Sequence, residues 1–286
     1  MIGGSNKKVG TEGSGSYSPF VGLGSAKLIC VNPSNEQYEK IVGRPMPYDL
    51  KYDAQTNEDG TKRYPYRILT HNEEAGYNFI DLSVTDKVEQ SQAGNSRFID
   101  FKGNSTWGAS LEAIADNEKM SWFNSDKARS AKVGEVDMIN LIIAFLRYSS
   151  KEEESQLMVD LKSSYKIDNM TDHKTVVTGL NKLFSDYKDN MVTLLYVVKE
   201  VSGKFYQEIS YKNAPFFPTN MDNATTKGSI YRCTKMDEDA RKRGVSFVKE
   251  DRIYNCGPLS KFNPEAFQSN KEELHGSTDS SSSDSW

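Results

Sequence analysis

Aromatic and basic residues alternate in three short stretches of the sequence, a combination that could hold an unpaired polynucleotide. The stretches are KRYPYR (62–67), RFIDFK (97–102) and KFYQEISYK (204–212). Cations follow the phosphates and release counterions, while flat rings stack on unpaired bases for about 1 to 3 kcal/mol each. Alternate residues of a strand share a face, so Tyr64 and Tyr66 are predicted to project together. The competing interpretation is ordinary strand packing, in which rings fill the core and cations solvate the surface.

These stretches supply the candidate nucleic-acid-binding residues. The first candidates are Lys62, Arg63, Tyr64, Tyr66, Arg67, Arg97, Phe98, Phe101, Lys102 and Trp107, and the second candidates are Tyr206 and Lys212. Three further cations, Lys127, Arg129 and Lys132, could line the same groove or simply solvate a loop. The basic cluster ARKRG (240–244) directly follows the acids of MDEDA, which favours self-neutralisation there.

No residue pattern indicates catalysis, a metal or a cofactor. The three histidines, at 71, 173 and 275, are far apart, and no phosphate-binding glycine loop occurs. The cysteines, at 30, 233 and 256, form no Cys-x-x-Cys pair, so neither a zinc site nor a disulfide framework is expected. We therefore expect no enzyme, although scattered nuclease carboxylates would leave no mark on the sequence.

Composition bounds the class of protein. The 286 residues carry a net charge of -4. Four of the acids lie in the last sixteen residues with a single lysine, so the rest of the chain is almost neutral and can still present a basic surface. No apolar run approaches the roughly 18 to 20 residues of a membrane span, and no secretory signal follows the first methionine. The sequence predicts a protein that stays in a cytoplasm and does not contact a membrane.

The chain closes on DSSSSDSW (279–286), a run that cannot pack in a core. An exposed tryptophan is useful only where a partner takes the ring while basic groups take the carboxylates. Asp279, Asp284 and Trp286 are therefore the candidate partner-binding residues. The alternative is that the serine-rich end is simply disordered and its tryptophan an accident of composition.

The periodicity predicts an α+β, β-rich chain in three parts. Residues 1–24 form a flexible glycine- and serine-rich arm, 25–265 a nucleic-acid-binding body with a helical insertion at about 128–190, and 266–286 a disordered acidic tail. Strands are expected at 26–31, 77–85 and 96–101, with a hairpin around NEDG (57–60) and a second across Ser202 and Gly203. A short helix should begin at Ser34, in capping-box register with Gln37, and end at Gly43. Further helices are expected at 135–149, near 153–161 and at 174–184.

Several stretches resemble the single-stranded DNA-binding proteins of crAss-like and related tailed bacteriophages. They are VNPSNEQYEKIVGRPM, DGTKRYPYRI, NFIDLSVTDK, FIDFKGNSTWG and ARSAKVGEVDMINLIIAFL, within residues 26 to 150, with a weaker echo at VVKEVSGKFYQEISY. The acidic tail ending in an aromatic is similar to the device by which bacterial and phage proteins of this class recruit partners. The tail departs from the usual one in being richer in serine than in acid, and no cysteine and histidine cluster matches zinc-containing relatives.

The resemblance implies an OB-like antiparallel barrel or sheet with helical insertions, no enzymatic activity and no cofactor. It implies binding of single-stranded DNA with little sequence preference during phage DNA replication or recombination, in the cytoplasm of an infected bacterial cell. The tail would recruit polymerase, helicase or primase. The alternative is a structural protein of the virion or of its assembly.

Overall fold

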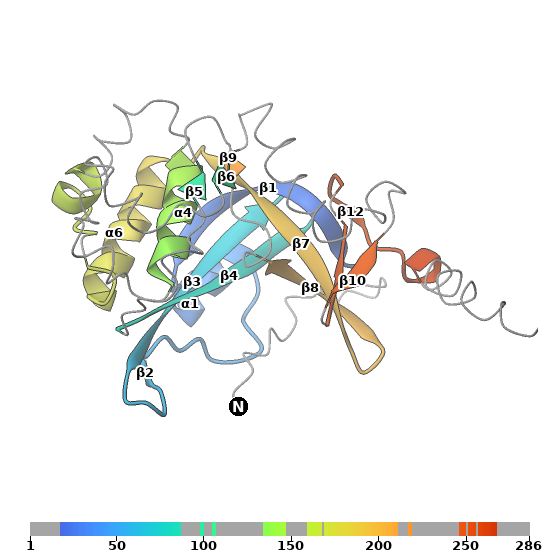
Figure 1. Cartoon of the computed structure of the whole chain (residues 1–286), viewed down its shortest axis with the longest axis horizontal. Coiled ribbons are helices and arrows are strands. Elements are labelled where there is room, and N and C mark those ends of the chain that lie inside the picture. Colours follow the sequence, from blue (N-terminus) through green and yellow to red (C-terminus); the bar gives the residue numbers. More distant parts are fainter. Residues whose placement is uncertain are drawn as a thin grey trace, which may run out of the picture.

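The computed structural model describes residues 18–86, 98–99, 105–106, 134–146, 159–167, 169–210, 217–218, 246–249, 251–255 and 257–267. These residues form a β-rich antiparallel sheet, curled into a half-barrel, with few helices (Figure 1). The long strands are β1 (Phe20–Val31), β3 (Lys62–Asn72), β4 (Gly76–Thr85), β7 (Met191–Val201) and β8 (Lys204–Ser210). Short strands extend the sheet: β2 (Gln55–Thr56), β9 (Phe217–Pro218), β10 (Phe247–Lys249), β11 (Arg252–Tyr254) and β12 (Ser260–Lys261). A separate two-stranded pair joins β5 (Phe98–Ile99) to β6 (Ser105–Thr106).

The central strand β1 joins the two halves of the sheet. Its residues 22–27 pair with β7, and its residues 27–31 pair with β3 across a register shift after Leu28. β3 forms a hairpin with β4, and β7 forms a hairpin with β8 through Ser202 and Gly203, both at positive φ. The spatial order of the long strands is therefore β8-β7-β1-β3-β4.

The curl of the sheet brings β8 back to the turn between β3 and β4, where one side chain joins them. The amide nitrogen of Gln207 donates to the Ala75 carbonyl at 3.2 Å and to Asn78 Oδ1 at 2.8 Å. Its amide oxygen accepts from the backbone N–H of Phe20 at 2.7 Å. Gln207 thus links β8, the start of β1 and the β3–β4 turn, and helps to hold the sheet curled.

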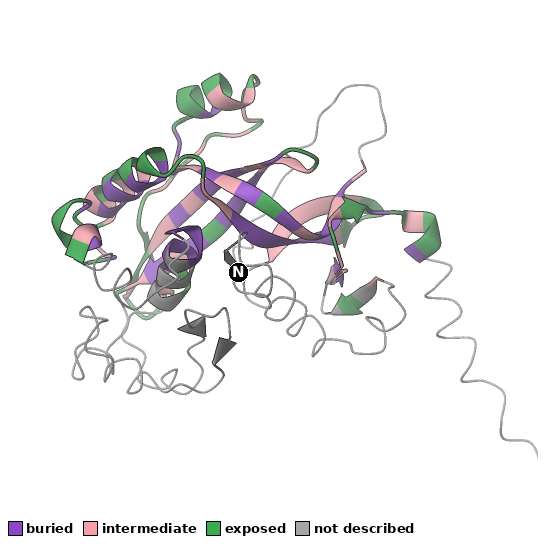
Figure 2. Cartoon of the chain, turned by 90° about the horizontal axis from the view of Figure 1, so that it is seen from above, coloured by how far each residue is buried: buried purple, intermediate pink, exposed green. Residues whose placement is uncertain are grey.

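The inner face of the sheet forms the main core with two helices of the insertion. α4 (Glu135–Leu146) and α6 (His173–Asp186) lie together on one side of the sheet in Figure 1. Leu141, Phe145 and Leu180 of these helices are buried together with Ile68 and Leu82 of the sheet. Figure 2 shows the exposed residues of the helices on the sides turned away from the strands. The predicted helical insertion is confirmed where it is described, with α6 within a residue or two of its predicted bounds.

The short helix α1 (Asn35–Val42) has the predicted ends. Ser34 Oγ accepts from the backbone N–H of Gln37, whose side chain accepts from the Ser34 N–H, and Gly43 follows in the left-handed conformation. These reciprocal bonds satisfy backbone groups that a helix end otherwise leaves open. The capping box and the terminating glycine are therefore confirmed.

The body is longer at both ends than predicted. β1 begins at Phe20, so residues 20–24 belong to the sheet and not to a flexible arm. The glycines there allow close packing: a Cβ at Gly22 would lie 2.6 Å from the Pro258 carbonyl oxygen, and one at Gly24 would lie 2.8 Å from Leu259 Cδ2. At the other end Phe267 is buried beside Phe262, with ring centroids 5.7 Å apart, so the body continues past residue 265.

A change at Gly179 tests how tightly α6 packs. A Cβ atom there would overlap the backbone carbonyl oxygen of Tyr165, so Gly179→Ala should destabilise the protein by about 1 to 3 kcal/mol through overpacking. The better helix propensity of alanine works against this loss by about 1 kcal/mol. Thr178→Ala, at the exposed neighbouring position, should stay within about 0.5 kcal/mol of the wild type. Urea unfolding followed by circular dichroism measures both, and equal stability of the two variants would contradict the tight contact.

Candidate nucleic-acid interface

Strand β3 divides the stretch KRYPYR between the two faces of the sheet. Tyr64 and Tyr66 point to the inner face, as predicted for residues two apart, and Arg63 and Arg67 take the outer face. The rings of this stretch and its two arginines therefore lie on opposite sides of the sheet. They do not form one surface.

Tyr66 is a core residue, and its prediction as a base-stacking residue is wrong. Its side chain is fully buried, its hydroxyl donates to the Met170 carbonyl, and its ring packs edge-on against His173 with centroids 5.0 Å apart. Tyr64, partly buried, packs against the same core and lies 6.0 Å from the His173 ring. The inner face is covered by the insertion helices, and a buried ring offers no face to a base.

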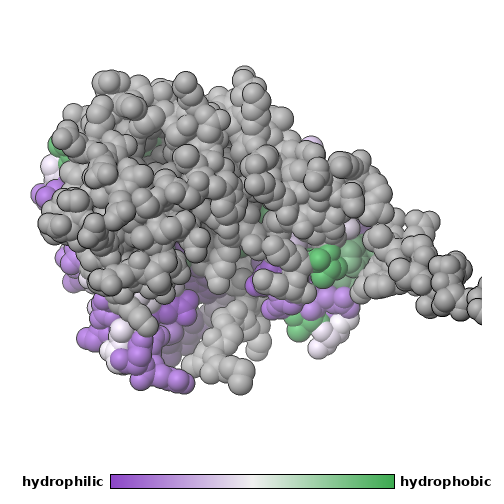
Figure 3. All heavy atoms as spheres, viewed as in Figure 1, coloured by the Kyte–Doolittle hydropathy of each residue, from purple (hydrophilic) through white to green (hydrophobic). Residues whose placement is uncertain are grey.

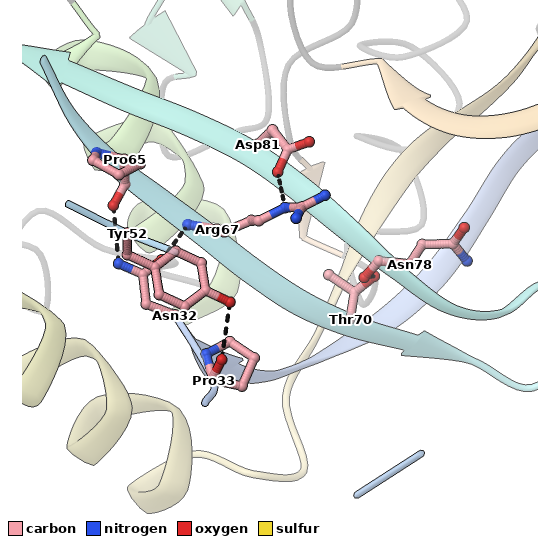
Figure 4. Close-up of polar contacts among 8 residues, drawn as sticks. All are labelled: Asn32, Pro33, Tyr52, Pro65, Arg67, Thr70, Asn78 and Asp81. Atoms are coloured by element: carbon pink, nitrogen blue, oxygen red, sulfur yellow. Dashed lines mark hydrogen bonds and ion pairs between the residues drawn. The ribbon is translucent and has the colours of Figure 1, made fainter. Parts of the chain in front are cut away.

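Arg67 and Asp81 form an ion pair on the outer face, at directly opposed positions of β3 and β4 (Figure 4). Arg67 Nε lies 2.6 Å from Asp81 Oδ1, and the guanidinium sits 4.4 Å from the Phe79 ring centroid and 5.8 Å from that of Tyr48. Burial lowers the pKa of Arg67, but the Asp81 carboxylate and the Tyr48 hydroxyl outweigh it, so the pKa is raised overall. The guanidinium is thus fixed over the ring of Phe79.

Arg63 differs from Arg67 in being exposed. Its Nε donates to Ser83 Oγ at 2.8 Å, which orients the guanidinium along the outer face. Within the described part of the chain, Arg63 makes no ion pair. Lys62 beside it is exposed too, and its backbone N–H donates to Asp86 Oδ1 at 2.7 Å. We call the residues Arg63, Arg67, Asp81 and Ser83 the outer patch.

The rest of the outer face is covered by α1 and the loop that follows it. Tyr38 of α1 stacks on Phe79 with centroids 5.8 Å apart, and Leu69 is buried in the same small cluster. The Tyr52 hydroxyl donates to the Pro33 carbonyl at 2.9 Å (Figure 4). Asn35 Oδ1 accepts from the N–H of Leu50 at 2.9 Å. The described residues therefore leave the outer face open only beyond Arg67, toward the start of β3.

Asn32 holds this end of β3 in place. It takes the left-handed conformation, with φ of 49°, where β1 passes into the helix connection. Its side chain accepts from the Arg67 N–H at 2.7 Å and donates to the Pro65 carbonyl at 2.9 Å (Figure 4). His173 Nε2 lies 2.6 Å from the same carbonyl, which brings the first turn of α6 to the strand. Contacts from Asn32, at the end of β1, and from His173, at the start of α6, therefore hold the β3 backbone that carries the outer patch.

Tyr206, the second candidate whose side chain the structure describes away from β3, does not lie at the outer patch. Tyr206 is half-buried on β8, opposite Lys199, on the strand that meets the β3–β4 turn, whereas Arg63 lies at the opposite end of β3. Phe98 is described only as backbone in β5. The remaining candidates lie outside the described residues: Arg97, Phe101, Lys102, Trp107, Lys127, Arg129, Lys132, Lys212, Asp279, Asp284 and Trp286.

Three residues at or next to the site were not among the candidates: Asp81, Ser83 and Tyr48. The alternation of Phe79, Asp81 and Ser83 against Ile80, Leu82 and Val84 is visible in the sequence and could have indicated the first two. Tyr48 lies in an irregular loop, and no periodicity points to it.

No protein-family model, no curated protein and no solved structure matches the chain. The helices within the described residues are all too short or too polar to cross a membrane. Over the same residues, no three His, Cys, Asp or Glu side chains gather into a set that could hold a metal ion.

Substitution of Tyr66 tests its place in the core. Tyr66→Ala should lower the free energy of unfolding by about 3 to 5 kcal/mol, because it leaves a large cavity. Tyr66→Phe should lower it by about 1 to 3 kcal/mol, because the buried Met170 carbonyl loses its donor. Thermal unfolding measures both, with Tyr187→Ala at an exposed position as the neutral control. An unchanged Tm for Tyr66→Ala would show that the Tyr66 ring is not part of the core.

Proposed function

We propose that the chain binds single-stranded nucleic acid through the outer patch of β3 and β4. The observation that carries the proposal is Arg63, a guanidinium oriented by Ser83 on the open part of the outer face with no ion-pair partner in the described chain. Such a group can take a phosphate without first breaking an internal pair. Lys62, the residue before it, is a second exposed cation at this end of the strand, and alternation starts its side chain on the other face.

The strand order supports this site. Three consecutive strands, β1, β3 and β4, are followed by β7, which returns to lie beside β1, and this is a Greek-key arrangement. With β8 as a fifth strand, the half-barrel is compatible with an OB fold, in which the face of the second and third strands binds oligonucleotides. Here those strands are β3 and β4, the two strands of the outer patch.

The connections support it as well. In OB folds the loops between strands one and two and between strands four and five flank the ligand. The corresponding segments are residues 32–61 and the turn at 202–203, and both hairpin tips extend from the lower side of the molecule in Figure 1. Residues 53–60 of the first segment are all exposed, and hydrophilic residues gather in that region in Figure 3.

The wider role follows from the resemblance of the sequence to phage single-stranded DNA-binding proteins. In that role the protein would coat unpaired DNA during replication or recombination, and the acidic tail with Asp279, Asp284 and Trp286 would recruit other replication proteins. Contacts to phosphate carry no sequence information, so the cations of the outer patch serve any sequence.

The double variant Lys62→Ala/Arg63→Ala tests the outer patch. It should weaken binding to a labelled single-stranded oligonucleotide and reduce the salt slope of log K by roughly 0.7 for each phosphate that the variant no longer neutralises. Fluorescence anisotropy at several salt concentrations gives both quantities. The control is Lys261→Ala, an exposed cation on β12 that pairs with the start of β1.

Equal affinity and an equal salt slope for the double variant and the wild type would remove the outer patch from the binding surface. Tighter binding to duplex than to single-stranded DNA would contradict the proposed substrate class.

A further inference from the structure

Asp81 places a carboxylate in the outer patch, opposite Arg67, where a phosphate-binding surface has no use for negative charge. Its Oδ1 accepts from Arg67 Nε at 2.6 Å, and its side chain is 43% exposed. Figure 4 shows the second oxygen turned away from Arg67. Among the described residues no donor is bonded to this second oxygen, Oδ2. The outer patch therefore presents one free acceptor among its cations.

The position of this acceptor is fixed. Arg67 is held between Phe79 and Tyr48, and Asp81 is bonded to Arg67 on a regular part of β4. A carboxylate on a flexible loop would turn toward water, whereas this one keeps its direction. A fixed acceptor can discriminate between ligands, because a ligand that does not offer a donor leaves it unsatisfied.

A free carboxylate oxygen repels a phosphate but accepts from a base. Cytosine and adenine carry an exocyclic amino group that donates, while thymine presents a carbonyl oxygen at the corresponding position. The one ring N–H donor of thymine lies between two carbonyl oxygens, which repel an approaching carboxylate. Unpaired bases expose these edges to side chains. The Arg63 guanidinium is bonded to Ser83, which lies two residues, or roughly 7 Å, from Asp81 along β4. A phosphate at this guanidinium and a base at Asp81 are therefore within reach of one short segment of nucleic acid.

We infer that Asp81 determines base preference at this site, favouring bases with an exocyclic amino group over thymine. The inference rests on the proposed nucleic-acid binding and adds a sequence preference that the cations alone do not give. Arg67 acts as the positioning residue, because it holds the Asp81 carboxylate in place. The carboxylate in turn compensates the charge of Arg67.

Oligonucleotides of equal length test the inference. The wild type should bind oligo-dC about tenfold more tightly than oligo-dT, the usual scale of one hydrogen bond to a charged group. Oligo-dC with N4,N4-dimethylcytosine, which has lost both amino hydrogens, should bind no better than oligo-dT. This comparison changes only the ligand, so it does not depend on the folding of any variant.

The variant Asp81→Asn supplies the complementary test. The amide oxygen can still accept from Arg67, and the amide nitrogen then faces the base as a donor, which suits the thymine carbonyl. The dC-to-dT affinity ratio should fall to one or below. Lys62→Ala/Arg63→Ala is the matched control, because it should weaken both oligonucleotides and leave their ratio unchanged.

The outcomes separate the two proposals. Equal binding of oligo-dC and oligo-dT by the wild type, or a ratio unaffected by Asp81→Asn, would overturn the role of Asp81 and leave the proposed function standing. A dimethylated oligonucleotide that binds as well as oligo-dC would also overturn it. Absence of binding to every oligonucleotide would overturn both.

Discussion

The two-residue alternation of β3 and β4, with one face buried, is the constraint on which the site depends. The insertion helices and the other strands bury the inner face, and Ile68, Ile80 and Leu82 fill it. Every second residue must then point inward, so the apolar ring of Tyr66 enters the core while Arg67, its neighbour, goes outward. A shift of one residue in the register would exchange these faces and bury two arginines, which is prohibitively costly.

The pairing of β1 with both halves of the sheet determines where the loop segments lie. β1 pairs with β7 along one part and with β3 along the other, so the sheet must curl around the core that these strands share. The curl brings β8 to the β3–β4 turn, where Gln207 makes three hydrogen bonds. The opposite end of β3 is left open, and the long 32–61 connection covers only part of the face beside it. The outer patch is what this covering leaves exposed.

Local patterns predicted local structure well, because capping bonds and alternation act over a few residues. Ser34, Gln37 and Gly43 bound α1 as expected, and the β7–β8 turn falls at Ser202 and Gly203. Which face of β3 is covered depends on helices about seventy residues or more away in sequence, so alternation could pair Tyr64 with Tyr66 but could not show that they face inward. Likewise, glycines 22 and 24 suggested flexibility, whereas contact with residues 257–259, far along the chain, makes them close-packing positions.

The two arginines of the outer face have different physical roles, although both lie on β3. The Arg67–Asp81 pair is partly exposed and adds at most about 1 kcal/mol as an ion pair. The larger effect of Arg67 is to cover the Phe79 ring at the margin of the cluster under α1, where a long side chain shields apolar surface from water. Arg67 thus completes the covered half of the outer face. Arg63, four residues earlier and on the same face, covers no such cluster, so its guanidinium keeps the freedom to bind an anion from solution.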